Sequence, residues 1–167
     1  VQNQVVDGAF NKDQVIANIN AAVAKARAAG VPVVWVQHSD DWMAIGSADW
    51  QIVPQLSPAD GEPKVGKLYR NSFEATNLEE VLAGLGVGHV YVCGAQTNNC
   101  VRYTTHGALE RGYDVTLLSD AHTTTDFETG GRKISAEFAV DELNSSVYGE
   151  ELPGRKGVAM KVEEAFA

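Results

Sequence analysis

The stretch Val90-Tyr-Val-Cys-Gly-Ala-Gln-Thr-Asn-Asn-Cys-Val-Arg-Tyr-Thr-Thr105 combines a strand, a turn and a helix start. Its first residues are apolar and mostly β-branched, which is typical of a buried parallel strand. The middle, Gly94 to Asn99, is small and polar, as expected of a turn, and a helix is predicted to follow whose first residues include Cys100. In open α/β sheets ligands bind where such strands end, so this stretch predicts the fold class and the place of a site.

The same order of helix and strand recurs on both sides of this stretch. Residues 11–29 carry apolar side chains at helical spacing and precede an apolar run at 32–37. Residues 76–85 predict a second helix before the strand at 89–93, and residues 114–119 predict the next strand. This alternation predicts a three-layer αβα fold with a central, mainly parallel sheet, of the Rossmann-like type.

The rest of the chain completes one unit of this kind. Residues 39–66 and 121–131 are rich in loop-forming residues, residues 132–147 predict a helix, and residues 158–166 predict a last strand. Neither a linker nor an internal repeat interrupts the pattern, and 167 residues suit one compact core. We therefore expect a single domain over residues 1–167.

The charge of the chain narrows the classes of partner. The formal net charge is −9, with 13 Lys and Arg against 22 Asp and Glu. Binding of nucleic acid relies on clustered basic side chains that displace counterions, so no nucleic-acid partner is expected. No apolar run approaches the roughly 18 to 20 residues that cross a bilayer, and no basic patch suits a membrane surface. We expect a cytoplasmic protein that acts on a small molecule.

The chain has two cysteines, Cys93 and Cys100, too few for a disulfide scaffold or a zinc site. Cys93 lies within the apolar strand, where burial accounts for it. Cys100 lies at a predicted helix N-terminus, where unpaired N–H groups and the positive dipole end stabilise a thiolate and an oxyanion. From this context alone, a nucleophile and a small structural residue remain open for Cys100.

The run from Cys93 to Val101 resembles the signature of the isochorismatase-like superfamily, which includes nicotinamidases, carbamoylsarcosine amidase and other small-amide hydrolases. Residues 67–78 resemble the lysine segment of that family, and residues 112–121 resemble its next strand and exit. The similarity spans most of the chain. It implies an amidase-type cysteine hydrolase in which Cys100 is the nucleophile and Lys67 its cationic partner.

The resemblance also implies a non-proline cis peptide bond at Ala95–Gln96, with the backbone N–H groups of Gln96 and Cys100 as the oxyanion hole. The family carries a base, an Asp, at the end of its first strand, and Val1-Gln2-Asn3 matches the residues after it. We therefore expect the first strand and this Asp just before Val1, outside the numbering. The family is commonly oligomeric, so a homodimer or homotetramer is expected.

No metal and no other cofactor is expected, because residues 37–42 lack the Asp-x-His order of the metal-dependent nicotinamidases. Contacts to the substrate are predicted only from their position near the expected mouth of the site. These residues are Gln2, Trp42, Tyr69, Arg70, Tyr103 and His122.

Two other functions compete with hydrolysis of a small amide, ureido or lactam C–N bond. One is an isochorismatase-type hydrolase of a vinyl ether, for which the cysteine is not obviously needed. The other is a non-catalytic paralogue that serves as a binding module. A nucleotide-binding protein is disfavoured because the chain has neither a Gly-x-Gly-x-x-Gly turn nor a phosphate-binding Gly-Lys-Ser/Thr loop.

Overall fold

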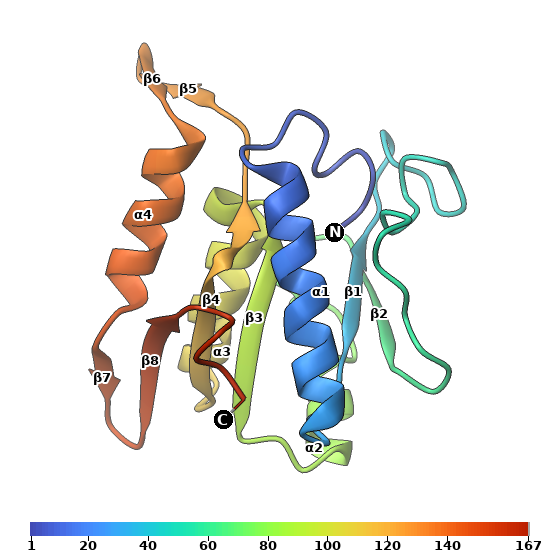
Figure 1. The fold of residues 1–167 in the computed structure, drawn as a ribbon, viewed down its shortest axis with the longest axis vertical. Coiled ribbons are helices and arrows are strands. Elements are labelled where there is room, and N and C mark those ends of the chain that lie inside the picture. Colours follow the sequence, from blue (N-terminus) through green and yellow to red (C-terminus); the bar gives the residue numbers. More distant parts are fainter. Residues whose placement is uncertain (167) are drawn as a thin grey trace.

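The computed structural model describes residues 1–166 and has a largely parallel β-layer at its centre (Figure 1). Strands β3 (His89–Ala95), β4 (Asp114–Thr123) and β8 (Arg155–Met160) pair in parallel in that order, and β7 (Glu150–Leu152) pairs antiparallel with β8. Two further strands, β1 (Trp35–His38) and β2 (Lys64–Lys67), form a separate parallel pair.

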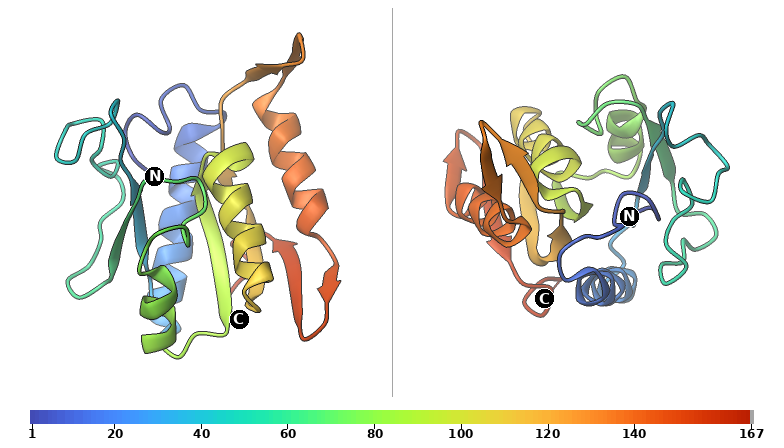
Figure 2. Two further views of the ribbon diagram at one scale, coloured as in Figure 1. Left: turned by 180° about the vertical axis from the view of Figure 1, so that it is seen from behind. Right: turned by 90° about the horizontal axis from the view of Figure 1, so that it is seen from above.

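Helices cover both faces of the strands (Figures 1 and 2). Helix α1 (Lys12–Ala28) lies on one face, and α2 (Leu78–Gly84) and α3 (Arg102–Glu110) lie on the other. Helix α4 (Ala136–Val147) packs against β4 and β8. The αβα fold class predicted from the alternation of elements is confirmed.

Strand β4 shows how the layers are held together. Its neighbouring residues Leu117 and Leu118 are both buried, and they face opposite layers. Leu118 packs in the cluster that contains Ile16 and Ile19 of α1, whereas Leu117 packs with Leu143 of α4. A strand that is apolar on both sides is the signature of a covered parallel sheet. No helix within residues 1–166 combines the length and apolar content that a membrane span requires.

The predictions after β4 need correction. The predicted helix at 132–147 begins only at Ala136, because residues Arg132–Ile134 form β6, which pairs antiparallel with β5 (Phe127–Thr129). Gly130 and Gly131 both have positive φ and make the tight turn between these strands. The last strand is β8 (Arg155–Met160), whereas the sequence predicted a strand at residues 158–166.

Strand β2 was missed because residues 39–66 were expected to form a loop. The strand is short, and only alternate residues, Val65 and Lys67, are buried. A lysine at an inward position weakens the apolar pattern from which a strand is recognised. Pairing with β1 nevertheless places Lys67 at the carboxyl end of the strand.

Hydrogen bonds to Glu62 connect α1 and β1 to the loop that precedes β2. Its carboxylate accepts hydrogen bonds from Arg27 Nε at 2.7 Å, Trp35 Nε1 at 2.6 Å and the Ala59 amide at 2.8 Å. The bond from Arg27, followed by that from Trp35, lowers the pKa of Glu62 from 4.5 to about 2. The ionised carboxylate is therefore a structural part of this junction.

We predict that Glu62→Gln lowers the free energy of unfolding by about 1 to 2 kcal/mol at neutral pH, since hydrogen bonds to a charged group are lost. Because the folded pKa lies below the ordinary value, the advantage of the wild type is complete above about pH 5 and disappears as the pH falls towards 2. Urea unfolding of both proteins across this pH range measures the difference. A difference that does not change with pH would contradict the assignment.

Candidate active site

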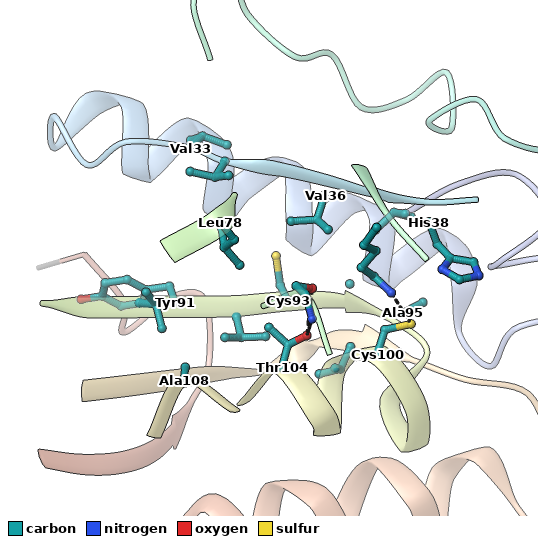
Figure 3. Close-up of a pocket in the computed structure, with 18 of the residues that line it drawn as sticks. Val33, Val36, His38, Leu78, Tyr91, Cys93, Ala95, Cys100, Thr104 and Ala108 are labelled. Atoms are coloured by element: carbon teal, nitrogen blue, oxygen red, sulfur yellow. Dashed lines mark hydrogen bonds between the residues drawn. The ribbon is translucent and has the colours of Figure 1, made fainter. Parts of the chain in front are cut away.

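A cavity of about 580 Å³ extends along the gap between β1 and β3, and the carboxyl ends of β1, β2 and β3 form one end of it (Figure 3). Apolar side chains, among them Val33, Val36 and Tyr91, line one part of it. Cys100 and Lys67 line another part, together with polar side chains of the neighbouring loops. The cavity therefore joins a hydrophobic surface to the two residues that were predicted to be catalytic, a combination typical of small-molecule sites.

Cys100 lies in η1 (Thr97–Val101), an irregular helical turn between β3 and α3. The Gln96 carbonyl accepts hydrogen bonds from the amides of Asn99 and Val101, both at 3.1 Å. Because Asn99 has non-helical dihedrals (φ −121°, ψ −106°), this turn is not part of the regular helix. The prediction that Cys100 lies in the first turn of α3 is therefore corrected: the helix begins at Arg102. The peptide bond between Ala95 and Gln96 is cis.

Lys67 is 6% exposed, and its ammonium group contacts the cysteine. The Nζ atom donates to Cys100 Sγ at 3.1 Å, to the Tyr69 carbonyl at 2.7 Å and to the Arg70 carbonyl at 3.3 Å. An ammonium has three N–H donors, so these three acceptors satisfy it. Negative charge on the sulfur strengthens its hydrogen bond, and the arrangement therefore stabilises an attacking sulfur anion.

The segment that follows Lys67 is docked on α3, close to the cysteine. Ser72 and Thr104 are in hydrogen-bond contact through their hydroxyl groups at 2.9 Å, and the Ser72 amide donates to Thr104 Oγ1 at 3.0 Å. Nearby, the Asn71 side chain lies directly on Gly107, where a Cβ atom would be 2.5 Å from Asn71 Nδ2. Sequence reasoning missed these contacts, although a glycine inside a helix was a signal of close packing.

Cys93 also lines the cavity, and Figure 3 shows its side chain pointing from β3 towards β1. Burial raises the pKa of this thiol to about 11. At neutral pH Cys93 is consequently a protonated thiol, which is a poor nucleophile.

The predicted substrate contacts divide into two groups. Trp42, 86% exposed, and Arg70 both line the cavity. The Arg70 guanidinium lies 5.6 Å from the ring centroid of Tyr103, a cation–π contact at the protein surface. The side chain of Tyr69 is exposed as well, but this residue reaches the site through its carbonyl, which binds Lys67.

The two remaining predicted substrate contacts, Gln2 and His122, form hydrogen bonds within the protein. Gln2 lines the cavity, but its amide donates to the His38 and Trp50 carbonyls and accepts from the His38 amide, each at 2.8 Å. The expectation that His122 lies at the mouth is wrong. Its ring is 1% exposed and is held by Thr97 and Asn144 behind η1.

His38 and Asp40 lie at the polar side of the cavity, 3.1 Å apart through Nε2 and Oδ2. Within residues 1–166, His, Cys, Asp and Glu side chains do not gather in any group of three or more that could hold a metal ion.

The amino-acid sequence matches a known protein family. The isochorismatase domain family matches residues 1–139. The ureidoacrylate amidohydrolase RutB of Pseudomonas syringae pv. syringae is 30% identical over 139 residues, and the secreted isochorismatase effector Isc1 of Verticillium dahliae is 34% identical over 108 residues. These matches cover 64% and 62% of this chain, and in both cases 57% of the relative, so the chain spans somewhat over half the length of these curated relatives.

A solved structure of an isochorismatase from Pseudomonas putida KT2440 superposes with a TM-score of 0.86 at 26% identity. The alignment covers 97% of this chain and 84% of that one. The arrangement of strands and helices is therefore common to both proteins.

The contact between Asn71 and Gly107 holds the segment that begins at Lys67 against α3, and its strength can be tested by stability measurements. Gly107→Ala should destabilise the protein by about 1 to 3 kcal/mol, because the new methyl group displaces Asn71 and the segment that begins at Lys67. In an Asn71→Ala background the same change should instead stabilise by about 0.5 to 1 kcal/mol, since alanine is the better helix former. A double-mutant cycle by urea unfolding measures this reversal, and equal effects in both backgrounds would rule out the clash.

Proposed function

Since the chain belongs to the isochorismatase family, we propose that it is a cysteine hydrolase that cleaves the C–N bond of a small amide, ureido or lactam compound. The observation that carries this proposal is the 3.1 Å contact between Lys67 Nζ and Cys100 Sγ at the wall of a cavity. The ureidoacrylate amidohydrolase supports the type of bond, because its name states that it hydrolyses an amide of this kind.

In the proposed reaction, Cys100 Sγ attacks the substrate carbonyl carbon and forms a C–S bond. The backbone N–H groups of Gln96 and Cys100 receive the oxyanion of the tetrahedral adduct, and the Lys67 ammonium stabilises negative charge on sulfur. Collapse of the adduct breaks the C–N bond, and the amine leaves with the proton that the thiol has lost. Water then hydrolyses the thioester, which releases a carboxylic acid and restores the thiol.

The substrate is proposed to be a small molecule that enters past Trp42, Tyr69, Arg70 and Tyr103. These side chains are exposed and lie on segments next to the cavity, and their aromatic surface suits a partly apolar ligand.

The same exposed aromatics suit a contact with a second copy of the chain, so we also propose a homo-oligomer. A cytoplasmic location agrees with two unpaired cysteines, because thiols persist in reducing compartments.

Hydrolysis of a vinyl ether is the second candidate, favoured by the likeness to the Pseudomonas putida isochorismatase. That reaction cleaves a C–O bond and proceeds without a thioester at Cys100. The third candidate is a non-catalytic paralogue that serves as a binding module, and its function would not depend on sulfur chemistry. Thioester trapping therefore separates the amide hydrolase from the other two candidates.

The decisive experiment incubates the protein with a panel of small amides and, separately, with iodoacetamide, and reads both by intact-protein mass spectrometry and ammonia release. We expect one alkylation on Cys100, an acyl adduct with at least one substrate, and loss of both in Cys100→Ala. Cys93→Ala is the matched control and should keep both, because burial holds Cys93 in the thiol form. An unmodified Cys100 in a folded wild type would exclude thioester chemistry.

Removal of the Lys67 charge generates a second prediction. Lys67→Met keeps most of the volume and removes the three hydrogen bonds, so kcat should fall by about 100-fold or more, as for loss of one stabiliser of an anionic transition state. Lys67→Arg is the charge-preserving control and should retain more activity. Steady-state kinetics on the substrate found above measures both, and equal kcat in Lys67→Met and wild type would contradict the assigned role.

A further inference from the structure

A buried polar network lies behind the turn that carries Cys100. The ring of His122, in β4, has a partner on each nitrogen: Nδ1 is 2.9 Å from Thr97 Oγ1, and Nε2 is 2.9 Å from Asn144 Oδ1. Thr97 is the first residue of η1 and is fully buried, and Asn144 belongs to α4. None of these three side chains lines the cavity, so one histidine links the sheet, the turn and a helix from outside the site.

The directions of these hydrogen bonds follow from Asn144. Its Nδ2 donates to the Ser119 carbonyl at 3.0 Å, so its Oδ1 is the atom that faces the histidine, and this oxygen can only accept. His122 Nε2 must therefore carry the hydrogen, which leaves Nδ1 as the acceptor for the Thr97 hydroxyl. Burial lowers the pKa of His122, against the opposing influence of Asn144 and Asp120, so the ring is neutral at physiological pH.

The turn itself has little regular structure to define its position. The Gln96 carbonyl closes it internally, but the backbone at Asn99 departs from helical dihedrals. Two hydrogen bonds connect the turn to the region where β4 ends. His122, in β4, binds Thr97, and Oγ1 of Thr124, the residue after β4, donates to Asn98 Oδ1 at 2.7 Å. Buried polar groups are costly unless satisfied, so a satisfied network of this kind restricts the turn to one position.

We propose that His122 is a positioning residue for the nucleophile. As the neutral Nε2–H tautomer it accepts the hydrogen bond of Thr97, fixes the start of η1, and so keeps Cys100 Sγ within hydrogen-bond distance of Lys67 Nζ. The catalytic consequence rests on the proposed cysteine hydrolase function, whereas the tautomer and the geometry do not. A displacement of about 1 Å at a reacting atom can cost about 100-fold in rate, so a distant hydrogen bond can control the reaction.

The test compares Thr97→Val, which keeps the shape and removes the hydroxyl, with Thr97→Ser, which keeps the hydroxyl. In Thr97→Val we expect two rates to fall about tenfold: the alkylation of Cys100 by iodoacetamide, and kcat on the amide identified above. A tenfold fall is the effect expected from the loss of one buried hydrogen bond. KM should stay within about twofold, and Thr97→Ser should restore the rate. Thr97→Ala tests the same loss should the valine variant fail to fold.

Nitrogen-15 NMR of the histidine rings supplies a readout that does not depend on activity. The wild type should show His122 protonated on Nε2 only, and Thr97→Val should shift the Nδ1 resonance because its hydrogen bond is lost. Asn98→Ala is the matched control, since it removes the other tie of the turn and should leave the His122 resonances unchanged.

Three results would overturn the proposal. The first is a wild-type His122 ring protonated on Nδ1, and the second is an unchanged alkylation rate in Thr97→Val. The third is a fall in rate in both Thr97→Val and Thr97→Ser that parallels the fall in Tm, because this would indicate a merely structural role. Failure of the proposed function has a different signature: no amide is cleaved by the wild type. The alkylation and NMR comparisons still decide the role of His122 in that case.

Discussion

Parallel pairing of β1 with β2 and of β3 with β4 is the constraint on which the candidate site depends. It places the carboxyl ends of four strands at one edge of the molecule (Figure 1). Lys67 ends β2, and the turn with Cys100 follows β3. Within residues 1–166, β2 and β3 lie in separate sheets. Side-chain contacts such as that of Ser72 with Thr104 connect the segment that follows Lys67 to the helix that follows Cys100.

The environment of Lys67 explains how a charged side chain is accommodated in the interior. No carboxylate within residues 1–166 forms an ion pair with it, and two backbone carbonyls and a sulfur atom accept its hydrogen bonds. Carbonyl dipoles compensate the cost of burial without neutralising the charge. The ammonium therefore keeps its positive charge next to the Cys100 sulfur, 3.1 Å away.

Periodicity predicts the long elements of the fold, and the resemblance identifies Cys100 and Lys67 although they are 33 residues apart in the sequence. The short strands β2, β5 and β6 were missed because their exposed positions carry charged residues, which obscures an apolar pattern. The role of His122 was mistaken for a different reason. Its partners Thr97 and Asn144 are 25 and 22 residues away in the sequence, so only the folded chain shows that the ring faces inward.

The environment of Cys93 has a consequence for oxidative damage. A cysteine oxidised by peroxide to a sulfenic acid is rescued when a second thiolate attacks it and forms a disulfide. Cys93 is the only other cysteine of the chain, and burial raises its pKa to about 11, so at neutral pH it contains almost no thiolate. Cys93 is therefore a poor resolving thiol for a sulfenic acid at Cys100, although both cysteines line the same cavity.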